Sequence, residues 1–333
     1  MATIDLPAAP AGDRGASSGP LWRAVSIALR APSIFNTQPW RWRLRSGNAW
    51  LSADRTRQLA NIDPDGRLLT VSCGVALHHA GRALAAIGHR PDILRWPDPD
   101  RPDLLARLSA GAAREPTPED VRALHAMLSR RTDRRPSAQD VQLPGYQLDA
   151  LRDAVEAHGV HLHVVREEQL PVLAVAAAHA AQVELADPEL RDDLDRWTHR
   201  SPAEHDGITA DTVVASVARR VPQRPFLPDR EAQLSPGTGS DRSASYAVLF
   251  TDADDRQAWL AAGEALSALL IDATQRHVSV NPISSAVEVA ASRAELSGML
   301  CHVGYPVLAL RLALGAGRPP RSPRRAPSDV IDT

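Results

Sequence analysis

The sequence predicts an α+β fold made of two halves, and each half contains a helix followed by a strand. Apolar residues recur at helical spacing from Leu21 to Leu29, whereas they alternate with arginines from Trp40 to Leu44, as in a half-buried strand. The same order of helix and strand returns at 146–165. A chain of 333 residues, 44% of them hydrophobic, is long enough to bury a core in each half.

In the first half, the helix at 21–29 must end before Pro32, because proline disrupts the hydrogen bonds of a helix interior. The strand at 40–44 is followed by a Ser-Gly-Asn turn at 46–48, which predicts a hairpin with a second strand around Trp50. Two more helices are expected in this half, one at 75–87 and one at 117–128 that begins with a Thr-Pro-Glu-Asp cap.

The second half begins with a helix that Gly159 ends and a strand at 160–165. Its other expected elements are helices at 170–185 and 259–275 and strands at 245–251 and 306–314. Residues 190–242 are polar and are interrupted by proline and glycine, a pattern typical of a lid. We therefore divide the chain into a loose tail (1–20), a first half (21–142) and a second half (143–333) that contains the lid segment at 190–242.

Charge and cysteine content exclude several classes of function. The formal net charge is -2, so the chain lacks the basic field of a nucleic-acid-binding protein. Every basic residue is arginine, so a phosphate site must use guanidinium or backbone N–H groups. Cys73 and Cys301 are far apart and form no CxxC pair, which indicates a cytoplasmic protein without a disulfide framework. We expect no membrane segment, and no metal site because His161 and His163 have no third ligand.

A first candidate site is the segment 31–40, Ala-Pro-Ser-Ile-Phe-Asn-Thr-Gln-Pro-Trp, which lies between a predicted helix and a predicted strand. Backbone groups are free at such a junction, and a flat ligand can approach it. The side chains of Asn36 and Gln38 can each donate and accept hydrogen bonds, as the edge of a polar ring requires. A turn whose polar side chains bond the nearby backbone explains the same residues equally well.

Two runs of arginine are candidate phosphate sites. The run Arg-Arg-Thr-Asp-Arg-Arg-Pro at 130–136 follows a helix, and the planar guanidinium can bond two phosphate oxygens at once. For an isolated run of this kind, a solvated basic helix end is the better explanation. The run Pro-Arg-Arg-Ala-Pro at 323–327 is near Arg318 and Arg321, and position alone does not single out one arginine among them.

Together these three segments resemble the flavin motifs of the nitroreductase family. The pattern is closest to the internally duplicated, dormancy-associated Acg-type proteins of actinobacteria, which are NAD(P)H nitroreductases by name. Gly304-Tyr305-Pro306 and the sequence Ala-Gly-Glu-Ala-Leu at 262–266 also match. The resemblance extends from about residue 21 to residue 331 and weakens between 190 and 242. It implies a nitroreductase fold, duplicated within the chain into a pseudo-two-fold pair of halves.

The resemblance also implies a set of residues that bind FMN. The resemblance implies that the segment 31–40 of the first half contacts one face of the flavin ring. The run at 130–136 contacts the phosphate and the pyrimidine side of the ring, and the C-terminal run at 323–327 also contacts the phosphate. The implied cofactor-binding residues are Pro32, Ser33, Ile34, Asn36, Gln38, Arg130, Arg131, Thr132, Arg134, Arg324 and Arg325. Phe35 occupies a position where the relatives generally have histidine. Arg134 is expected to stabilise negative charge on the reduced ring, and no residue is assigned as a catalytic acid or base.

The function implied by the resemblance is that of an FMN-binding oxidoreductase that takes electrons from NAD(P)H and passes them to a small-molecule acceptor. The alternative is a protein that sequesters or stores FMN with little turnover. Because each half supplies what a separate subunit would supply, we expect a monomer with one flavin per chain.

Overall fold

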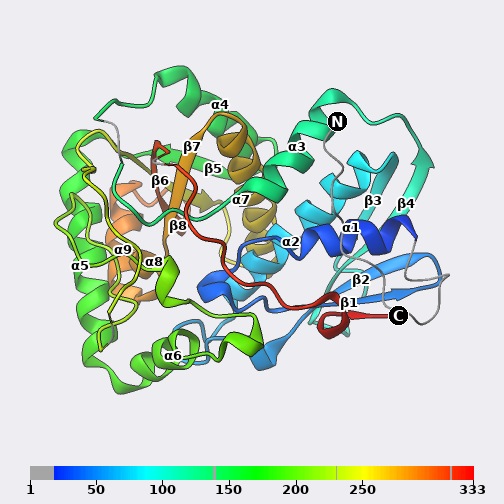
Figure 1. Ribbon diagram of the computed structural model, residues 1–333, viewed down its shortest axis with the longest axis horizontal. Coiled ribbons are helices and arrows are strands. Elements are labelled where there is room, and N and C mark those ends of the chain that lie inside the picture. The colour runs from blue at the N-terminus through cyan, green and yellow to red at the C-terminus, as the bar shows by residue number, and fades with distance from the viewer. Residues whose placement is uncertain (1–18, 138–139, 230, 316) are drawn as a thin grey trace.

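The computed structural model describes residues 19–137, 140–229, 231–315 and 317–333. Two sheets lie on either side of a central pair of long helices (Figure 1). The central helices are α2 (Arg67–Ala86) and α7 (Arg256–Gln275), and they pack directly against each other. Within the described part of the chain, no helix has the length and apolar character needed to cross a membrane.

The first sheet has the strand order β3-β4-β2-β1-β9. Trp40 and Trp42 of β1 are fully buried, whereas the arginines between and after them are exposed, as the alternating pattern predicts. Helix α1 covers this sheet together with α2, and α3 packs on α2. The bounds are α1 Pro20–Ala28, β1 Trp40–Arg45, β2 Asn48–Ala53, β3 His89–Arg95, β4 Leu104–Ala113, α3 Pro118–Ser129 and β9 Ile331–Asp332.

The second sheet has the order β5-β6-β8-β7, and all its neighbouring strands are antiparallel. From Pro306 to Ala313, strand β8 is buried, because helices cover both faces of the sheet. The bounds are α4 Gly145–Glu156, β5 His161–Val164, α5 Leu170–Ala186, β6 Ser245–Thr251, β7 Val278–Ile283, α8 Ser285–Glu288, α9 Ala290–Met299 and β8 Tyr305–Leu314.

The C-terminal segment joins the two sheets. After β8 the chain crosses the middle of the molecule to the other sheet, as the red trace in Figure 1 shows. There β9 pairs in parallel with β1, with Ile331 opposite Trp42. A boundary at residue 142 therefore does not separate the two sheets, because the end of the second half completes the sheet of the first.

Several elements differ from the expectation. The helix expected at 75–87 begins at Arg67, because Asp63 accepts hydrogen bonds from the backbone N–H groups of Leu68 and Leu69 at 3.1 and 2.8 Å. Strands β3, β4 and β7 and helices α8 and α9 were not predicted. Helix α1 starts at Pro20, and residues 1–18 of the expected tail lie outside the described residues.

The segment 190–242 is better ordered than its polar composition indicates. It begins within helix α6 (Pro188–Thr198), whose Trp197 is 1% exposed. Its apolar residues form a small core with residues that are distant in sequence, namely Phe35, Leu59 and Ile62. Asp193 also accepts the backbone N–H groups at residues 61 and 62. Because the partners lie more than 100 residues away, local periodicity could not reveal this core.

The two central helices meet at a pair of glycines. An added Cβ on Gly74 of α2 lies 2.2 Å from the carbonyl oxygen of Leu260, and one on Gly263 of α7 lies 2.0 Å from that of Val71. Such distances are far below van der Waals contact, so only glycine allows the helices to approach this closely. The two glycines occupy corresponding places, because each is the point at which its helix touches the backbone of the other.

We predict that Gly263→Ala lowers the free energy of unfolding by about 1–3 kcal/mol, the usual cost of forcing extra atoms into a packed core. The matched control is Gly298→Ala in α9, where an added Cβ meets nothing within 4 Å. The control should be neutral or slightly stabilising, because alanine favours the helix. Urea denaturation of both variants measures the difference, and equal midpoints would show that the helix crossing tolerates a side chain.

Candidate functional site

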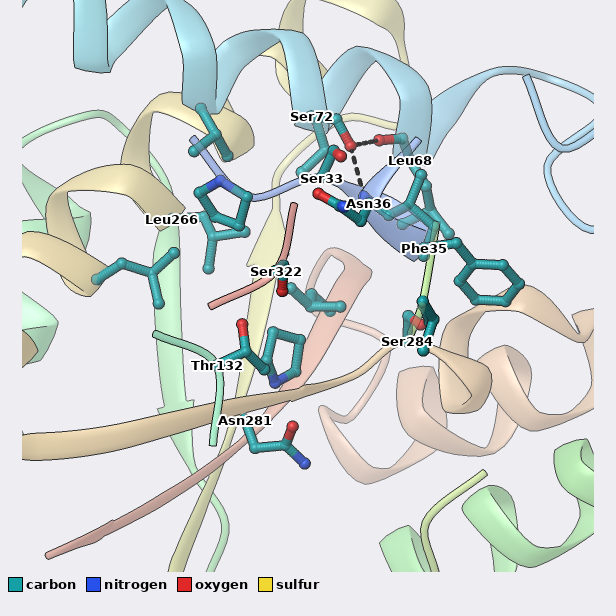
Figure 2. A pocket seen from close by; sticks show the side chains of 18 of the residues that line it. Ser33, Phe35, Asn36, Leu68, Ser72, Thr132, Leu266, Asn281, Ser284 and Ser322 are labelled. Carbon is teal, nitrogen blue, oxygen red and sulfur yellow. Dashed lines mark hydrogen bonds between the residues drawn. The ribbon is translucent and has the colours of Figure 1, made fainter. Parts of the chain in front are cut away.

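A cleft, here called the main cavity, lies between the two sheets beside the central helices; the empty space in it amounts to about 890 Å³ with open solvent included. Figure 2 shows Ser33, Asn36 and Ser72 on one side of it and Thr132, Asn281 and Ser322 on the other. The first group belongs to the segment after α1 and to α2, and the second to the chain after α3, to β7 and to the C-terminal segment. Both halves therefore line the cavity.

The segment 32–38 is held in an unusual backbone conformation. Phe35, Asn36 and Gln38 have φ values of 45°, 55° and 50°, in the left-handed region that residues other than glycine rarely adopt. Two serines stabilise it, because the N–H of Gln38 donates to Ser33 Oγ at 2.9 Å and the N–H of Ile34 donates to Ser72 Oγ at 3.0 Å. Backbone strain of this kind gathers at ligand sites, where the surrounding structure fixes it.

The side-chain amides of Asn36 and Gln38 bond the protein's own chain, and Asn36 also lines the main cavity. Asn36 Nδ2 donates to the carbonyl oxygens of Gly207 and Pro323 at 3.0 and 3.1 Å. Gln38 Nε2 donates to the carbonyl of His205 at 3.0 Å, and its Oε1 accepts the N–H of Arg325 at 3.0 Å. Together they connect the segment 32–38 to both the lid segment and the C-terminal segment.

Five arginines line a smaller cavity of about 340 Å³, here called the arginine cavity: Arg30, Arg130, Arg131, Arg321 and Arg324. It shares part of its wall with the main cavity, since Arg130 and Arg324 line both. Arg324 Nη1 donates to Asn36 Oδ1 at 2.8 Å, which fixes the position of its guanidinium. The Nε atoms of Arg130 and Arg324 are buried and have no hydrogen-bond partner in the described structure.

Among the described residues, none of these five arginines forms an ion pair with a carboxylate, although other buried arginines of the chain do. Arg311 and Arg219 bond Asp241 at 2.6 and 3.0 Å, and Arg224 bonds Glu184 at 2.7 Å. Buried charges in proteins are normally paired, because desolvation of an isolated charge is costly. The arginine cavity is thus a site of uncompensated positive charge, suited to an anion with several oxygens.

The pKa values of the arginines also indicate an excess of positive charge at the arginine cavity. Burial, together with repulsion from Arg131, lowers the pKa of Arg130 to about 10. Burial and the neighbouring Arg130, Arg30 and Arg131 lower that of Arg324 to about 9. All of these guanidinium groups remain charged near neutral pH, so each is destabilised by its neighbours. A bound anion removes this cost.

Arg134 lies where the main cavity meets the lid segment. Its Nη1 donates to the carbonyl oxygen of Thr212 at 3.0 Å, and its guanidinium carbon lies 5.0 Å from the ring centre of Phe226. Burial lowers its pKa to about 10. Ile208 and Phe226 of the lid segment also line the cavity, so this segment forms part of the site.

Most of the residues predicted from the sequence lie around the two cavities. Those that line the main cavity are Pro32, Ser33, Ile34, Asn36, Arg130, Thr132, Arg134 and Arg324. Arg131 lines the arginine cavity only. Gln38 and Arg325 line neither; Arg325 Nη2 instead donates to the carbonyl oxygen of Asp329 at 2.7 Å. Sequence analysis named Arg321 among the C-terminal arginines without singling it out, and it missed Arg30, Ser322, Asn281 and Ser284, which belong to no recognisable motif.

The comparisons with known proteins identify the family of the chain. "Putative NAD(P)H nitroreductase Rv3131" of Mycobacterium tuberculosis is 34% identical over 315 residues, which cover 92% of this chain and 90% of that protein. The chain belongs to the Acg-type nitroreductase family. The acg protein of the same organism is 32% identical over 314 residues, covering 92% of this chain and 94% of its own. No protein-family model matches the sequence.

Among solved structures, the chain shows similarity to a nitroreductase with bound FMN from Bacteroides fragilis. The match covers 58% of this chain and 88% of that one, at 13% identity and a TM-score of 0.36. A second match is NfrA2 of B. megaterium, at 10% identity and a TM-score of 0.37. Both scores are low, and the family assignment depends on the sequence relatives alone.

We predict that Arg131→Gln stabilises the ligand-free protein by up to about 1 kcal/mol, since it removes one of several mutually repelling and partly solvated charges. Inorganic phosphate should raise the melting temperature of the native protein more than that of the variant. The matched control is Arg122→Gln, because Arg122 is paired with Glu119 on an exposed helix face, and it should be neutral or slightly destabilising. If Arg131→Gln lowers the free energy of unfolding, the claim that the positive charges of the arginine cavity are uncompensated is wrong.

Proposed function

We propose that the chain is an FMN-dependent oxidoreductase that takes electrons from NAD(P)H and passes them to a small acceptor. The observation that carries the proposal is the union of a mostly apolar cavity with a cluster of unpaired arginines at one end. FMN has the same two-part chemistry, a flat ring system and one terminal phosphate. When bound, FMN supplies the two-electron redox chemistry.

The residues around the cavities divide into two roles. Arg130 and Arg324 would hold the phosphate, with Arg131 adding positive charge beside them. Ser33, Ile34 and the chain at 281–284, which line the main cavity, would contact the ring. Arg134, which lines the main cavity but not the arginine cavity, would stabilise negative charge on the reduced ring. The protein thus binds and orients the cofactor, and no side chain is needed as a general acid or base.

A second candidate function is storage or sequestration of FMN. The lid segment favours it, because Ile208 and Phe226 of this segment line the main cavity and would limit access to a cofactor bound there. Hydrogen bonds from Asn36 and Gln38 to residues 205 and 207 hold this segment in place. Reaction with NAD(P)H separates the two functions, since a storage protein has no need to admit a nicotinamide.

We predict that the purified protein shows the absorbance bands of oxidised flavin and that heat releases FMN, because one phosphate fits the arginine cavity. Anaerobic addition of NADPH or NADH should bleach the bands within seconds. Bands that persist for hours would support storage, and release of FAD as the main cofactor would refute the proposed phosphate site.

We further predict that Arg324→Ala weakens FMN binding about 30-fold or more, the usual effect of removing one partner of a desolvated charged contact. Quenching of FMN fluorescence on titration with the apoprotein measures this. The matched control is Arg122→Ala. Arg122 is exposed and lines neither cavity, so this variant should bind FMN as tightly as the native protein does. Equal FMN affinities of the Arg324→Ala and Arg122→Ala variants would contradict the proposed role of Arg324.

We also propose that each chain binds one flavin and acts as a monomer, with the two halves related by duplication. Val75, which follows Gly74 on α2, lines the main cavity. The residue that follows Gly263 on α7 is Glu264, which is 2% exposed and bonds Arg95 through two contacts of 2.6 Å. If the two halves are related by duplication, Glu264 corresponds to Val75. The Glu264–Arg95 pair would then stand where a second cavity, equivalent to the main cavity, is expected.

We predict a stoichiometry near one FMN per chain for fully reconstituted protein, and a monomeric mass. Flavin absorbance, protein concentration and light scattering measure both quantities on the same sample. Two flavins per chain would show that the Glu264–Arg95 pair leaves room for a second site, and an obligate dimer would contradict the assignment of both sides of the cleft to a single chain.

A further inference from the structure

Three charged side chains that are distant in the sequence meet in the interior, where the lid segment contacts α5 and α8. Arg224 of the lid segment donates from Nη2 to Glu184 of α5 at 2.7 Å, and the same nitrogen contacts Glu288 of α8. The side chains of Arg224, Glu184 and Glu288 are 3%, 4% and 2% exposed. The two glutamates are here called the acid pair. Because they share one guanidinium nitrogen, their carboxyl groups lie close together.

The acid pair has one negative charge too many if both of its members are ionised. Arg224 supplies a single positive charge, and a buried charge without a partner is costly. Two adjacent carboxyl groups avoid this cost when one of them keeps its proton. Burial, which outweighs the attraction of Arg224, raises the pKa of Glu184 to about 8, and the neighbouring Glu288 adds to this rise. Near neutral pH the acid pair therefore holds one proton, and Arg224 compensates its one negative charge.

A third acid lies near the acid pair and titrates at lower pH. Arg224 and Glu288 are the charged side chains that act most strongly on Glu184, and Glu288 in turn acts on Asp63. Burial raises the pKa of Asp63 to about 6; hydrogen bonds and the nearby Arg67 oppose this rise, and Glu288 adds to it. Asp63 is thus mostly ionised above about pH 7, so it contributes little to changes between about pH 7 and about pH 8.

Arg224 connects the acid pair to the wall of the main cavity. Its guanidinium carbon lies 4.6 Å from the ring centre of Phe35 and 5.6 Å from that of Phe226, and both rings line the main cavity. Three residues later, Leu227 is buried in the same small core as Phe35 and Ile208. A change in the contacts of Arg224 therefore acts on the part of the lid segment that lines the cavity.

We propose that Arg224 and the acid pair form a pH-dependent latch, which holds the lid segment closed for as long as the acid pair keeps its proton. When the proton is lost, two carboxylates and one guanidinium remain in the interior, and opening of the lid segment at 207–227 gives all three access to water. Low pH thus favours the closed lid segment and high pH favours the open one. The latch controls access to the main cavity whichever ligand binds there.

The direction of the pH dependence follows from the pKa of Glu184 in the two states. In the open state water reaches this carboxyl group, and its pKa returns toward the usual value of 4.5. The closed state binds the proton more tightly, so its advantage is complete below pH 4.5 and is lost as the pH rises to about 8. Opening should become about tenfold more favourable per pH unit within this range, and it should level off above it.

Hydrogen–deuterium exchange of the ligand-free protein, followed by mass spectrometry, measures this opening. Suitable reporters are the N–H groups of Gly207, Ile208 and Val213, which bond backbone carbonyl oxygens at 3.3, 2.8 and 3.3 Å. Their exchange is compared with that of an unstructured peptide at each pH, which removes the intrinsic pH dependence of exchange. The protection of these amides in the native protein should fall about tenfold per unit from about pH 6 to about pH 8 and then stay constant.

Two single variants test the acid pair independently of each other. Glu184→Gln and Glu288→Gln each remove one carboxylate and leave the other to form a neutral ion pair with Arg224. Protection in either variant should change by no more than about threefold over the same range, which allows for the titration of Asp63. The matched control is Glu189→Gln, an exposed glutamate of α6, and this variant should keep the slope of the native protein.

Infrared spectroscopy of the native protein provides a second measurement, which decides the question even where a variant does not fold. The C=O stretching band of a protonated carboxyl group should lose intensity between about pH 7 and about pH 9. This loss should be absent from both variants of the acid pair.

Constant protection of the native amides over the pH range, or a native infrared spectrum without this loss, would overturn the latch. Variants of the acid pair that keep the native slope would overturn it as well, and so would a Glu189→Gln variant that loses the slope. Both measurements use the protein without a cofactor, so a failure of the latch remains distinguishable from a failure of the proposed oxidoreductase function.

Discussion

The close crossing of α2 and α7 at Gly74 and Gly263 is the constraint on which the rest of the structure depends. Each glycine lets the backbone of one helix touch that of the other, and both helices also contribute to the wall of the main cavity. Leu68 and Val71 come from α2, whereas Leu266 and Leu270 come from α7. A wider crossing would move these two sets apart, so the spacing of the helices sets the width of the cavity.

The arginine cavity shows how a fold can tolerate unfavourable electrostatics in a local region. Several other buried guanidinium groups of the described structure have carboxylate partners, as Arg311 has Asp241 and Arg224 has Glu184. At the arginine cavity no carboxylate among the described residues plays this part, so the packing of the rest of the protein must outweigh the repulsion between the arginines.

Sequence analysis singles out most of the residues that line the two cavities, but not their contacts. The segments at 31–40 and 130–136 and the run at 323–327 stand out because together they resemble the nitroreductase motifs; taken alone, their residues do not decide between a ligand site and an ordinary turn, helix end or tail. The direction of Asn36 could not be predicted, since its partners Gly207 and Pro323 lie 171 and 287 residues away. Asn281 could not be recognised either, because it belongs to an ordinary-looking strand. The small core around Trp197 was missed for the same reason, because three of its eight buried members come from the first part of the chain.

The position of Arg324 in the sequence has a consequence for the order in which the protein is made. Arg324 lies between β8 and β9, and β9 attaches this segment to β1, whose residues are synthesised almost 290 positions earlier. During translation, the first sheet therefore lacks the strand that covers its β1 edge until residues 331 and 332 have left the exit tunnel. Until then, the part of the chain outside the ribosome has no β9 to hold Arg324 in place. Any ligand whose binding needs Arg324 can therefore bind only after this segment has been synthesised, and it cannot guide the earlier folding of the first half.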